Sequence, residues 1–253
     1  MLMSKIISII LLLIFSITFT LFSVYKTNQY MKVVDVKGKV KISSQKTITK
    51  PAQYGDLLFT KDNISTEKNS SLVSYLESNN IFKVKENSLL NINESYDKTG
   101  NTKLYLDKGD FLIAASSNTK QDSIIISTSN ADIKVSGVAA VSYSNGNTKA
   151  QFIYGDGEIN GTKINQFMEA NIDNSNKLSL KNIELNKEFT NIINEIASMP
   201  YVETVVADKI DINNIKNQMY SQTNTVSEIT SIDYAGNTNE NRTTFIITNE
   251  RKE

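Results

Sequence analysis

The chain reads Leu104-Tyr-Leu-Asp-Lys-Gly109-Asp-Phe-Leu-Ile-Ala114 and, after a polar loop, Ile124-Ile-Ile-Ser-Thr128-Ser-Asn-Ala131-Asp-Ile-Lys-Val135-Ser-Gly137. Three short apolar runs are separated by Gly, Asn and Asp residues, which favour turns. Apolar and polar residues alternate around Leu104/Leu106 and Ile133/Val135, a period of two that is typical of half-buried strands. The stretch from Leu104 to Val141 therefore predicts a β-rich structure and carries no catalytic motif.

Short strand patterns continue on both sides of this stretch, and turn residues recur roughly every ten positions, as expected for an all-β sandwich or barrel. Asn145-Gly146 between two apolar runs is the clearest hairpin signal. A coiled, solenoid-like stacking of strands is an alternative that fits the same periodicity. The predicted strands are Leu72–Leu76, Ile81–Val84, Leu89–Ile92, Lys103–Leu106, Phe111–Ala114, Ile124–Ser127, Asp132–Val135, Ala139–Tyr143, Ala150–Tyr154 and Glu158–Ile164.

Six short motifs in residues 33–165 share the order and spacing of one protein family. They are Gly38-Lys39-Val40, Tyr54-Gly55-Asp56, Glu86-Asn87-Ser88, Thr102-Lys-Leu104-Tyr-Leu106-Asp-Lys-Gly109, Thr128-Ser-Asn-Ala131-Asp-Ile133-Lys-Val135-Ser-Gly137 and Tyr154-Gly-Asp-Gly157-Glu. Together they resemble FecR-type domains, which occur in extracytoplasmic regulators of bacterial envelope signalling. The resemblance implies a jelly-roll-like β-sandwich over residues 33–165. We expect structural turn positions at Gly55, Asp56, Asn87, Ser88, Gly109 and Gly137.

An uncharged apolar run covers residues 6–24 near the amino end. As a helix it would be roughly 28 Å long, close to the ~30 Å hydrocarbon core of a bilayer. We interpret it as an uncleaved transmembrane helix, preceded by a cytoplasmic stub (1–5) and followed by a tether (25–32). A cleaved signal peptide is the alternative, although Phe22-Ser-Val-Tyr-Lys26 is a poor cleavage site. This predicts a single-pass protein of the bacterial cytoplasmic (inner) membrane, with its bulk in the periplasm.

The carboxyl-terminal third changes its pattern. Residues 166–183 read as a polar connector, and residues 184–253 as a smaller region of helix and β-hairpin. Apolar side chains at helical spacing predict a helix over 184–198 that packs on the sandwich or the next segment, or alternatively binds a partner. A weaker helix is expected over 213–221 and a hairpin over 224–248. The join Asp233-Tyr-Ala-Gly236-Asn237-Thr resembles the closing hairpin of bacterial immunoglobulin-like modules.

Composition excludes several kinds of site. The chain has no Cys and no His, so thiol nucleophiles, common zinc sites and Ser-His-Asp triads are absent. Its 27 basic residues balance 27 acidic ones, which gives no electrostatic footprint for nucleic acid. The acidic pairs Asp107/Asp110 and Asp156/Glu158 occupy positions where turns are expected. We therefore expect no enzyme activity, cofactor, metal site or nucleic-acid partner.

The resemblance implies a sensor or regulatory binding module in envelope signalling. FecR proteins of the iron-citrate regulator kind carry a cytoplasmic domain that handles a sigma factor. Only five residues precede the apolar run here, so we do not expect a sigma-factor-binding domain. The alternative is a structural protein that uses its β domain for adhesion or scaffolding. The expected partner is an envelope protein or a cell-wall polymer, with the membrane contacted through residues 6–24.

Overall fold

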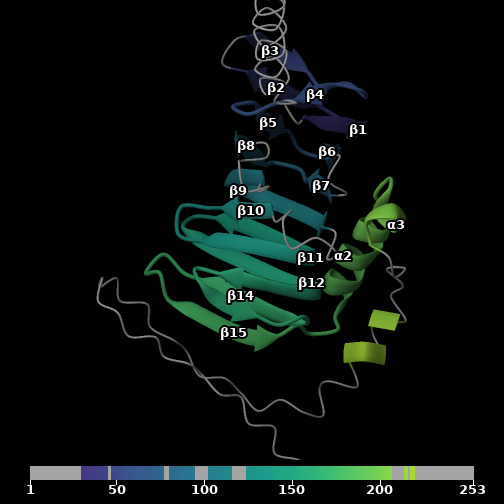
Figure 1. The fold of residues 1–253 in the computed structure, drawn as a ribbon. Helices are drawn as coiled ribbons and strands as arrows, with labels where there is room; N and C mark the ends of the chain where they lie inside the picture. The colour runs from purple at the N-terminus through teal and green to yellow at the C-terminus, as the bar shows by residue number, and fades with distance from the viewer. Residues whose placement is uncertain are drawn as a thin grey trace, which may run out of the picture.

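The computed structural model describes residues 30–44, 47–76, 80–94, 102–115, 124–206, 214–215 and 217–219. Within these ranges the protein is mainly β, as the sequence predicts (Figure 1). The expected stub, transmembrane helix and carboxyl-terminal hairpin lie outside them. Among the described helices, none combines the length and apolar character needed to cross a bilayer. The elements are β1 (Met31–Lys37), β2 (Val40–Ser44), β3 (Thr47–Pro51), β4 (Leu57–Leu58), β5 (Asn63–Thr66), β6 (Ser71–Leu76), β7 (Asn80–Val84), β8 (Leu89–Glu94), β9 (Thr102–Ala115), β10 (Ile124–Ser127), β11 (Asp132–Ser144), β12 (Asn147–Ile159), β13 (Thr162–Ile164), β14 (Met168–Ile172), β15 (Leu178–Asn182), α2 (Lys187–Ala197) and α3 (Val202–Val205).

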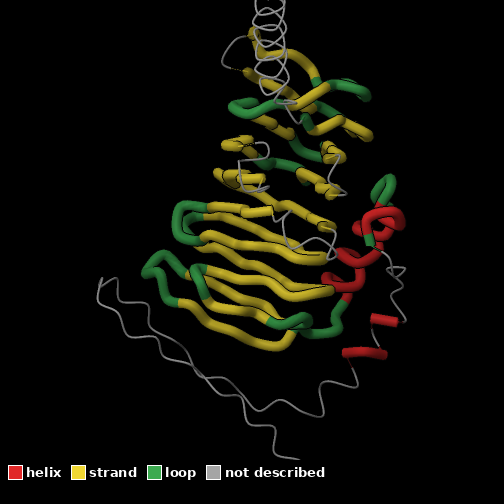
Figure 2. The backbone as a smooth tube through the Cα atoms, in the orientation of Figure 1, coloured by secondary structure: helices red, strands yellow, loops and turns green. Residues whose placement is uncertain are grey.

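The strands form two layers that face each other. The helix-covered layer contains, in hydrogen-bonded order, β4, β1, β6, β7, the second half of β9, the second half of β11, the first half of β12, β14 and β15. The open layer contains β3, β2, β5, β8, the first half of β9, β10, the first half of β11, the end of β12 and β13. From β1 and β2 onward, neighbouring strands follow the order of the chain. With β3 and β4 outermost, the strands stack from these two at one end to β15 at the other (Figures 1 and 2).

Three long strands connect the layers. β9 lies in the open layer up to Lys108, and from Gly109 it pairs with β7 and β11 in the helix-covered layer. β11 and β12 change layers where Gly137 pairs with Gly155. Strands that switch sheets at bends make the corners of such sandwiches. The sequence patterns predict a break between two strands at each of these positions, because a glycine inside an apolar run usually signals a turn.

The main hydrophobic core lies between the layers. In the open layer, alternate side chains such as Leu104 and Leu106 point inward, and so do Phe111 and Ile113 beyond the bend in β9. Phe82 stacks on Phe111 with ring centroids 5.3 Å apart. Burial of large side chains contributes about 1.5–3 kcal/mol each, so this interior is the main source of stability.

A second core covers the outer face of the helix-covered layer. Leu112, Ala114 and Ile153 point away from the main core and belong to a cluster with α2, α3, Ile215 and Met219. Figure 2 shows the helices on this one side of the strands. Where the helices lie, this layer therefore has both faces buried, whereas the outer face of the open layer carries solvent-exposed residues such as Lys134 and Lys163.

The structure corrects two expectations and does not confirm a third. The described strand pairings do not confirm a jelly-roll-like sandwich, and their order also fits a coiled stacking of strands. Residues 166–183 are not a polar connector: β14 and β15 extend the helix-covered layer, because Ala170, Ile172 and Leu178 alternate inward between polar neighbours. The tether is shorter than 25–32, since β1 begins at Met31, whose side chain is fully buried. The hairpin at Asn145-Gly146 is confirmed between β11 and β12.

Candidate functional site

Helix α2 is positioned by its sequence. Asn186 caps its amino end, where the Asn186 Oδ1 accepts a hydrogen bond of 2.9 Å from the backbone N–H of Phe189. Phe189, Ile193 and Ile196 are buried against the outer face of the sheet, as the helical spacing predicts. The helix prediction over 184–198 is therefore confirmed, and the helix packs on the sandwich.

Ion pairs fix the far half of α2 to the sheet. The Glu195 carboxylate lies 2.8 Å from the Nζ atoms of both Lys83 and Lys85, which project from the end of β7 and the residue after it. Burial acts to raise the pKa of Glu195, but the hydrogen bonds and charges of the two lysines outweigh it and hold the pKa below its ordinary value. Glu195 therefore stays ionised at neutral pH and links α2 to the sheet.

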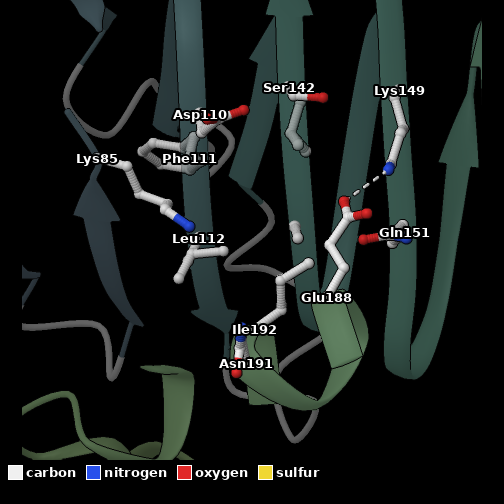
Figure 3. A pocket seen from close by; sticks show the side chains of 12 residues that line it. Lys85, Asp110, Phe111, Leu112, Ser142, Lys149, Gln151, Glu188, Asn191 and Ile192 are labelled. Atoms are coloured by element: carbon white, nitrogen blue, oxygen red, sulfur yellow. Dashed lines mark hydrogen bonds and ion pairs between the residues drawn. The ribbon is translucent and has the colours of Figure 1, made fainter. Parts of the chain in front are cut away.

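A cleft of about 240 Å³ opens between α2 and the strands β9, β11 and β12 (Figure 3). Its apolar part includes Leu112, Ala140 and Ile192, and charged side chains stand around it. Small-molecule pockets usually measure about 300–1,000 Å³, so the cleft suits a partner's side chain or a small polar group better than a large ligand. The lining residues are Lys85, Asp110, Phe111, Leu112, Ala140, Val141, Ser142, Lys149, Gln151, Glu188, Asn191 and Ile192.

The charges around the cleft are of both signs. Lys149 Nζ lies 3.2 Å from the Glu188 carboxylate on α2 (Figure 3). Burial raises the pKa of Asp110 above its ordinary value, the charges of Lys85 and Lys149 oppose this, and the nearby glutamates add to it. Asp110 is thus the carboxylate at the cleft whose charge the fold disfavours.

A buried amide group adds a polar contact point to the cleft. Gln151 is only 5% exposed, and its Nε2 donates to Glu169 Oε2 at 2.8 Å. Its Oε1 is buried and has no hydrogen-bond partner among the described protein atoms. An unmatched acceptor of this kind costs free energy unless a donor reaches it. This oxygen is closed off from solvent, so a donor bound at the cleft reaches it only if the Gln151 side chain moves.

The expected turn positions lie elsewhere, in the scaffold. Asn87 and Ser88 form the turn from β7 to β8, where Asn87 has φ 57°, and Gly109 lies against Ser88 at the bend in β9. Gly137 (φ 125°) lies at the bend in β11 and faces Gly155.

The turn at Gly55 (φ 87°) and Asp56 precedes β4. Asp56 Oδ2 accepts from the Gln53 N–H at 2.8 Å, and its Oδ1 lies 2.5 Å from Lys50 Nζ. None of the six expected positions lines the cleft.

Sequence reasoning did not find the cleft itself. Lys85, Asp110, Lys149 and Glu188 are far apart in the chain, and single charged residues on strands are usually solvated. One signal was available: Asp110 and Leu112 are two residues apart and fall on the same face of β9, and apolar residues on that face indicate that another element covers it. Among the described residues, no group of three or more acidic side chains could hold a metal ion.

Comparison with known families identifies the central part of the sandwich. Residues 62–158 match a family model described as FecR protein. The chain contains a FecR domain. The match begins just before β5 and ends near the end of β12, so it covers the three layer-crossing strands. The FecR match leaves out β1–β4, β13–β15 and both labelled helices. No curated protein is significantly similar to the chain.

Two solved structures resemble the chain distantly. Both are crystal structures of a candidate anti-sigma factor from Parabacteroides distasonis, at 1.65 Å and 2.50 Å resolution. The first has 14% identity and a TM-score of 0.44, covering 51% of this chain and 64% of its own length. The second has 12% identity and a TM-score of 0.43, covering 65% of this chain and 92% of its own length. This chain thus spans less than two thirds of the first structure.

Proposed function

We propose that this protein is an extracytoplasmic sensor or regulatory binding module of bacterial envelope signalling, anchored in the cytoplasmic membrane through residues 6–24. The observation that carries the proposal is the FecR domain at residues 62–158. It acts by binding an envelope protein and catalyses nothing. A regulatory protein of this kind needs a surface whose occupancy can be coupled to a conformational change.

The cleft beside α2 is the surface that best meets this need. Its apolar part could take an apolar side chain of the partner, and Lys85, Asp110, Lys149 and Glu188 around it could select partner groups by charge. Because α2 forms one wall, a bound partner would alter the packing of a helix held mainly by side-chain contacts and two groups of ion pairs. The cleft is therefore placed to couple binding to the position of α2.

Site-specific crosslinking in intact cells tests this proposal. A photo-reactive amino acid replaces Asn191, which is exposed beside the cleft, or Lys134, which is exposed on the outer face of the open layer. We expect one defined envelope protein to be captured from position 191 and not from position 134. Deleting the gene for that protein should then change the same envelope transcripts as deleting this chain.

The opposite pattern would favour the structural alternative. Capture from position 134 alone, together with sedimentation of the chain with purified peptidoglycan, would assign it to adhesion or scaffolding through the open layer. Turnover of a small substrate by the purified protein would overturn the non-catalytic part of the proposal.

A further inference from the structure

Large exposed apolar side chains gather at one end of the strand stack. Among the described residues, the large hydrophobic side chains with high exposure are Tyr54 (68%), Leu57 (42%), Phe59 (42%) and Tyr201 (53%). The first three come from a single short segment, whereas Tyr201 lies at α3. Single exposed apolar residues are ordinary on protein surfaces, but a cluster marks an interaction surface.

This segment closes the end of the stack formed by β3 and β4 (Figure 1). Among the described strands, β4 pairs only with β1, and Leu57 lies opposite Lys32 at the edge of the sheet. The ring of Phe59 lies 6.4 Å from that of Tyr30. Tyr54 belongs to the loop that joins β3 to β4. We call Tyr30, Lys32, Lys50, Tyr54, Leu57 and Phe59 the end surface.

The composition of the end surface suits the interface between lipid and water. Tyr, with its apolar ring and polar hydroxyl, is enriched at the headgroup level of membranes, and Lys near that level is attracted by lipid phosphates. Lys32 and Lys50 are exposed at this end, and Lys50 forms an ion pair with Asp56. β3 also ends in Pro51. Proline has no backbone N–H to donate to a further strand, so it suits an edge strand.

Chain length places this end next to the uncharged run. Five residues, 25–29, separate Val24 at the end of that run from Tyr30. Five residues span at most about 18 Å. If residues 6–24 cross the bilayer, the end surface cannot lie far from its surface, whereas β15 and the far end of the stack can.

We propose that the end surface docks onto the headgroup region of the phospholipid bilayer, with Tyr54, Leu57 and Phe59 inserted between the headgroups. This rests on the membrane anchoring in the proposed function. Docking fixes the direction of the strand stack: β3 and β4 face the membrane, and the cleft beside α2, which lies on β9, β11 and β12, is held away from it. The cleft then remains accessible to a protein partner.

Tryptophan fluorescence in lipid vesicles tests the proposal with the full chain. The protein has no Trp, so a single substitution creates a unique reporter. Phe59→Trp and Tyr54→Trp report on the end surface, and Tyr201→Trp is the matched control because it is an aromatic of similar exposure at α3. Each variant is reconstituted in vesicles of phosphatidylglycerol and phosphatidylethanolamine, with or without lipids brominated near the headgroup end of the acyl chain.

We expect brominated lipid to quench most of the emission from Trp at positions 54 and 59 and to leave the emission from Trp at position 201 unchanged. The emission from positions 54 and 59 should also be shifted to the blue in vesicles. If the protein floats with the vesicles but positions 54 and 59 are quenched no more than position 201, docking is overturned while anchoring stands. If the protein does not float with the vesicles, anchoring itself fails. A blue shift that depends on protein concentration and occurs without lipid would overturn docking in favour of self-association through the end surface.

Discussion

Ser88 lies directly against Gly109 at the corner where β9 passes from one layer to the other. Its Oγ accepts a hydrogen bond of 3.0 Å from the Asp110 N–H, and its side chain is almost completely buried. A Cβ atom added to Gly109 would lie 2.1 Å from that Oγ and 2.5 Å from the Ser88 Cα. Two motifs that are 21 residues apart in sequence thus form one interlocked corner.

Gly109→Ala should destabilise the fold by more than the ~1 kcal/mol typical of point mutants. Gly109 has φ 100°, which L-residues rarely adopt, and the added methyl group would also collide with Ser88. Gly161→Ala is the matched control, since Gly161 has φ 82° and nothing lies within 4 Å of an added Cβ. Chemical denaturation of both variants separates the two causes. Equal losses of unfolding free energy would show that backbone conformation alone, and not the contact with Ser88, requires glycine at the corner.

The sequence predicted the strands better than their arrangement. Alternation at Leu104/Leu106 and Ile133/Val135 located the first halves of β9 and β11, because only one face of these halves is buried. It could not show that β9 continues through Gly109, since the same glycine also fits a turn. β14 and β15 were missed because their exposed faces are polar and the turn at Asp173–Asn176 dominates the pattern. Pairing between distant strands is set by tertiary packing, which local periodicity does not contain.

The candidate site was less predictable than the fold. The apolar face of α2 follows from spacing alone, and the structure buries Phe189 and Ile193 as that spacing requires. The cleft depends on which strands lie beneath α2. Asp110, Lys149 and Glu188 meet only because β9, β12 and α2 pack together, and no short-range pattern in the sequence records that contact.

Acid should weaken the attachment of α2 to the sheet. The pKa of Glu195 is lowered in the folded protein, so its ion pairs with Lys83 and Lys85 contribute stability that is fully present above its ordinary value of 4.5 and is lost as pH falls through the lowered value. Thermal melts between pH 7 and pH 3 should show Glu195→Gln losing less stability on acidification than the parent protein. Glu203→Gln, at a glutamate of α3, serves as control. If Glu195→Gln loses as much stability on acidification as the parent protein, the ion pairs of Glu195 are not the source of the acid sensitivity.

Asp110→Asn should raise the stability of the protein at neutral pH, in contrast to the loss of the Glu195 ion pairs. Because the folded state raises the pKa of Asp110, the native protein holds its proton more tightly than the unfolded chain, and stability falls as pH rises from the ordinary value through the raised one. Removing the charge should therefore stabilise the protein at pH 7 and have little effect at pH 3, as measured by denaturant midpoints. Destabilisation at pH 7 would show that attraction to Lys85 and Lys149 outweighs burial.

The amino-terminal cap of α2 should stabilise the first turn of the helix that forms one wall of the cleft. Asn186→Ala removes the acceptor for the Phe189 N–H and should cost about 1 kcal/mol. Asn186→Asp keeps the acceptor and places a negative charge at the helix start, so it should retain stability. Hydrogen exchange of the first turn of α2 is the direct measurement. Faster exchange in Asn186→Ala alone is expected, and equal exchange in both variants would show that the cap does not hold the helix.

The sequence predicts that the β domain ends at residue 165. We expect the folding unit to extend beyond that residue. A fragment of residues 30–165 lacks β14, so the edge of β12 loses its partner, and the inward side chains Ala170, Ile172 and Leu178 are missing from the main core. Each large side chain removed forfeits about 1.5–3 kcal/mol, a sizeable share of the 5–15 kcal/mol typical of a whole domain.

A fragment of residues 30–206 should melt cooperatively as a monomer, whereas 30–165 should unfold at a much lower temperature or aggregate. A fragment of residues 30–183 separates the two contributions, because it restores β14 and β15 but leaves Leu112, Ala114 and Ile153 without α2. We expect it to fold and to self-associate through that uncovered face, as measured by circular dichroism and sedimentation velocity. A stable, monomeric 30–165 fragment would show that the stack up to β13 is sufficient, and that β14, β15 and α2 are additions to a domain already complete.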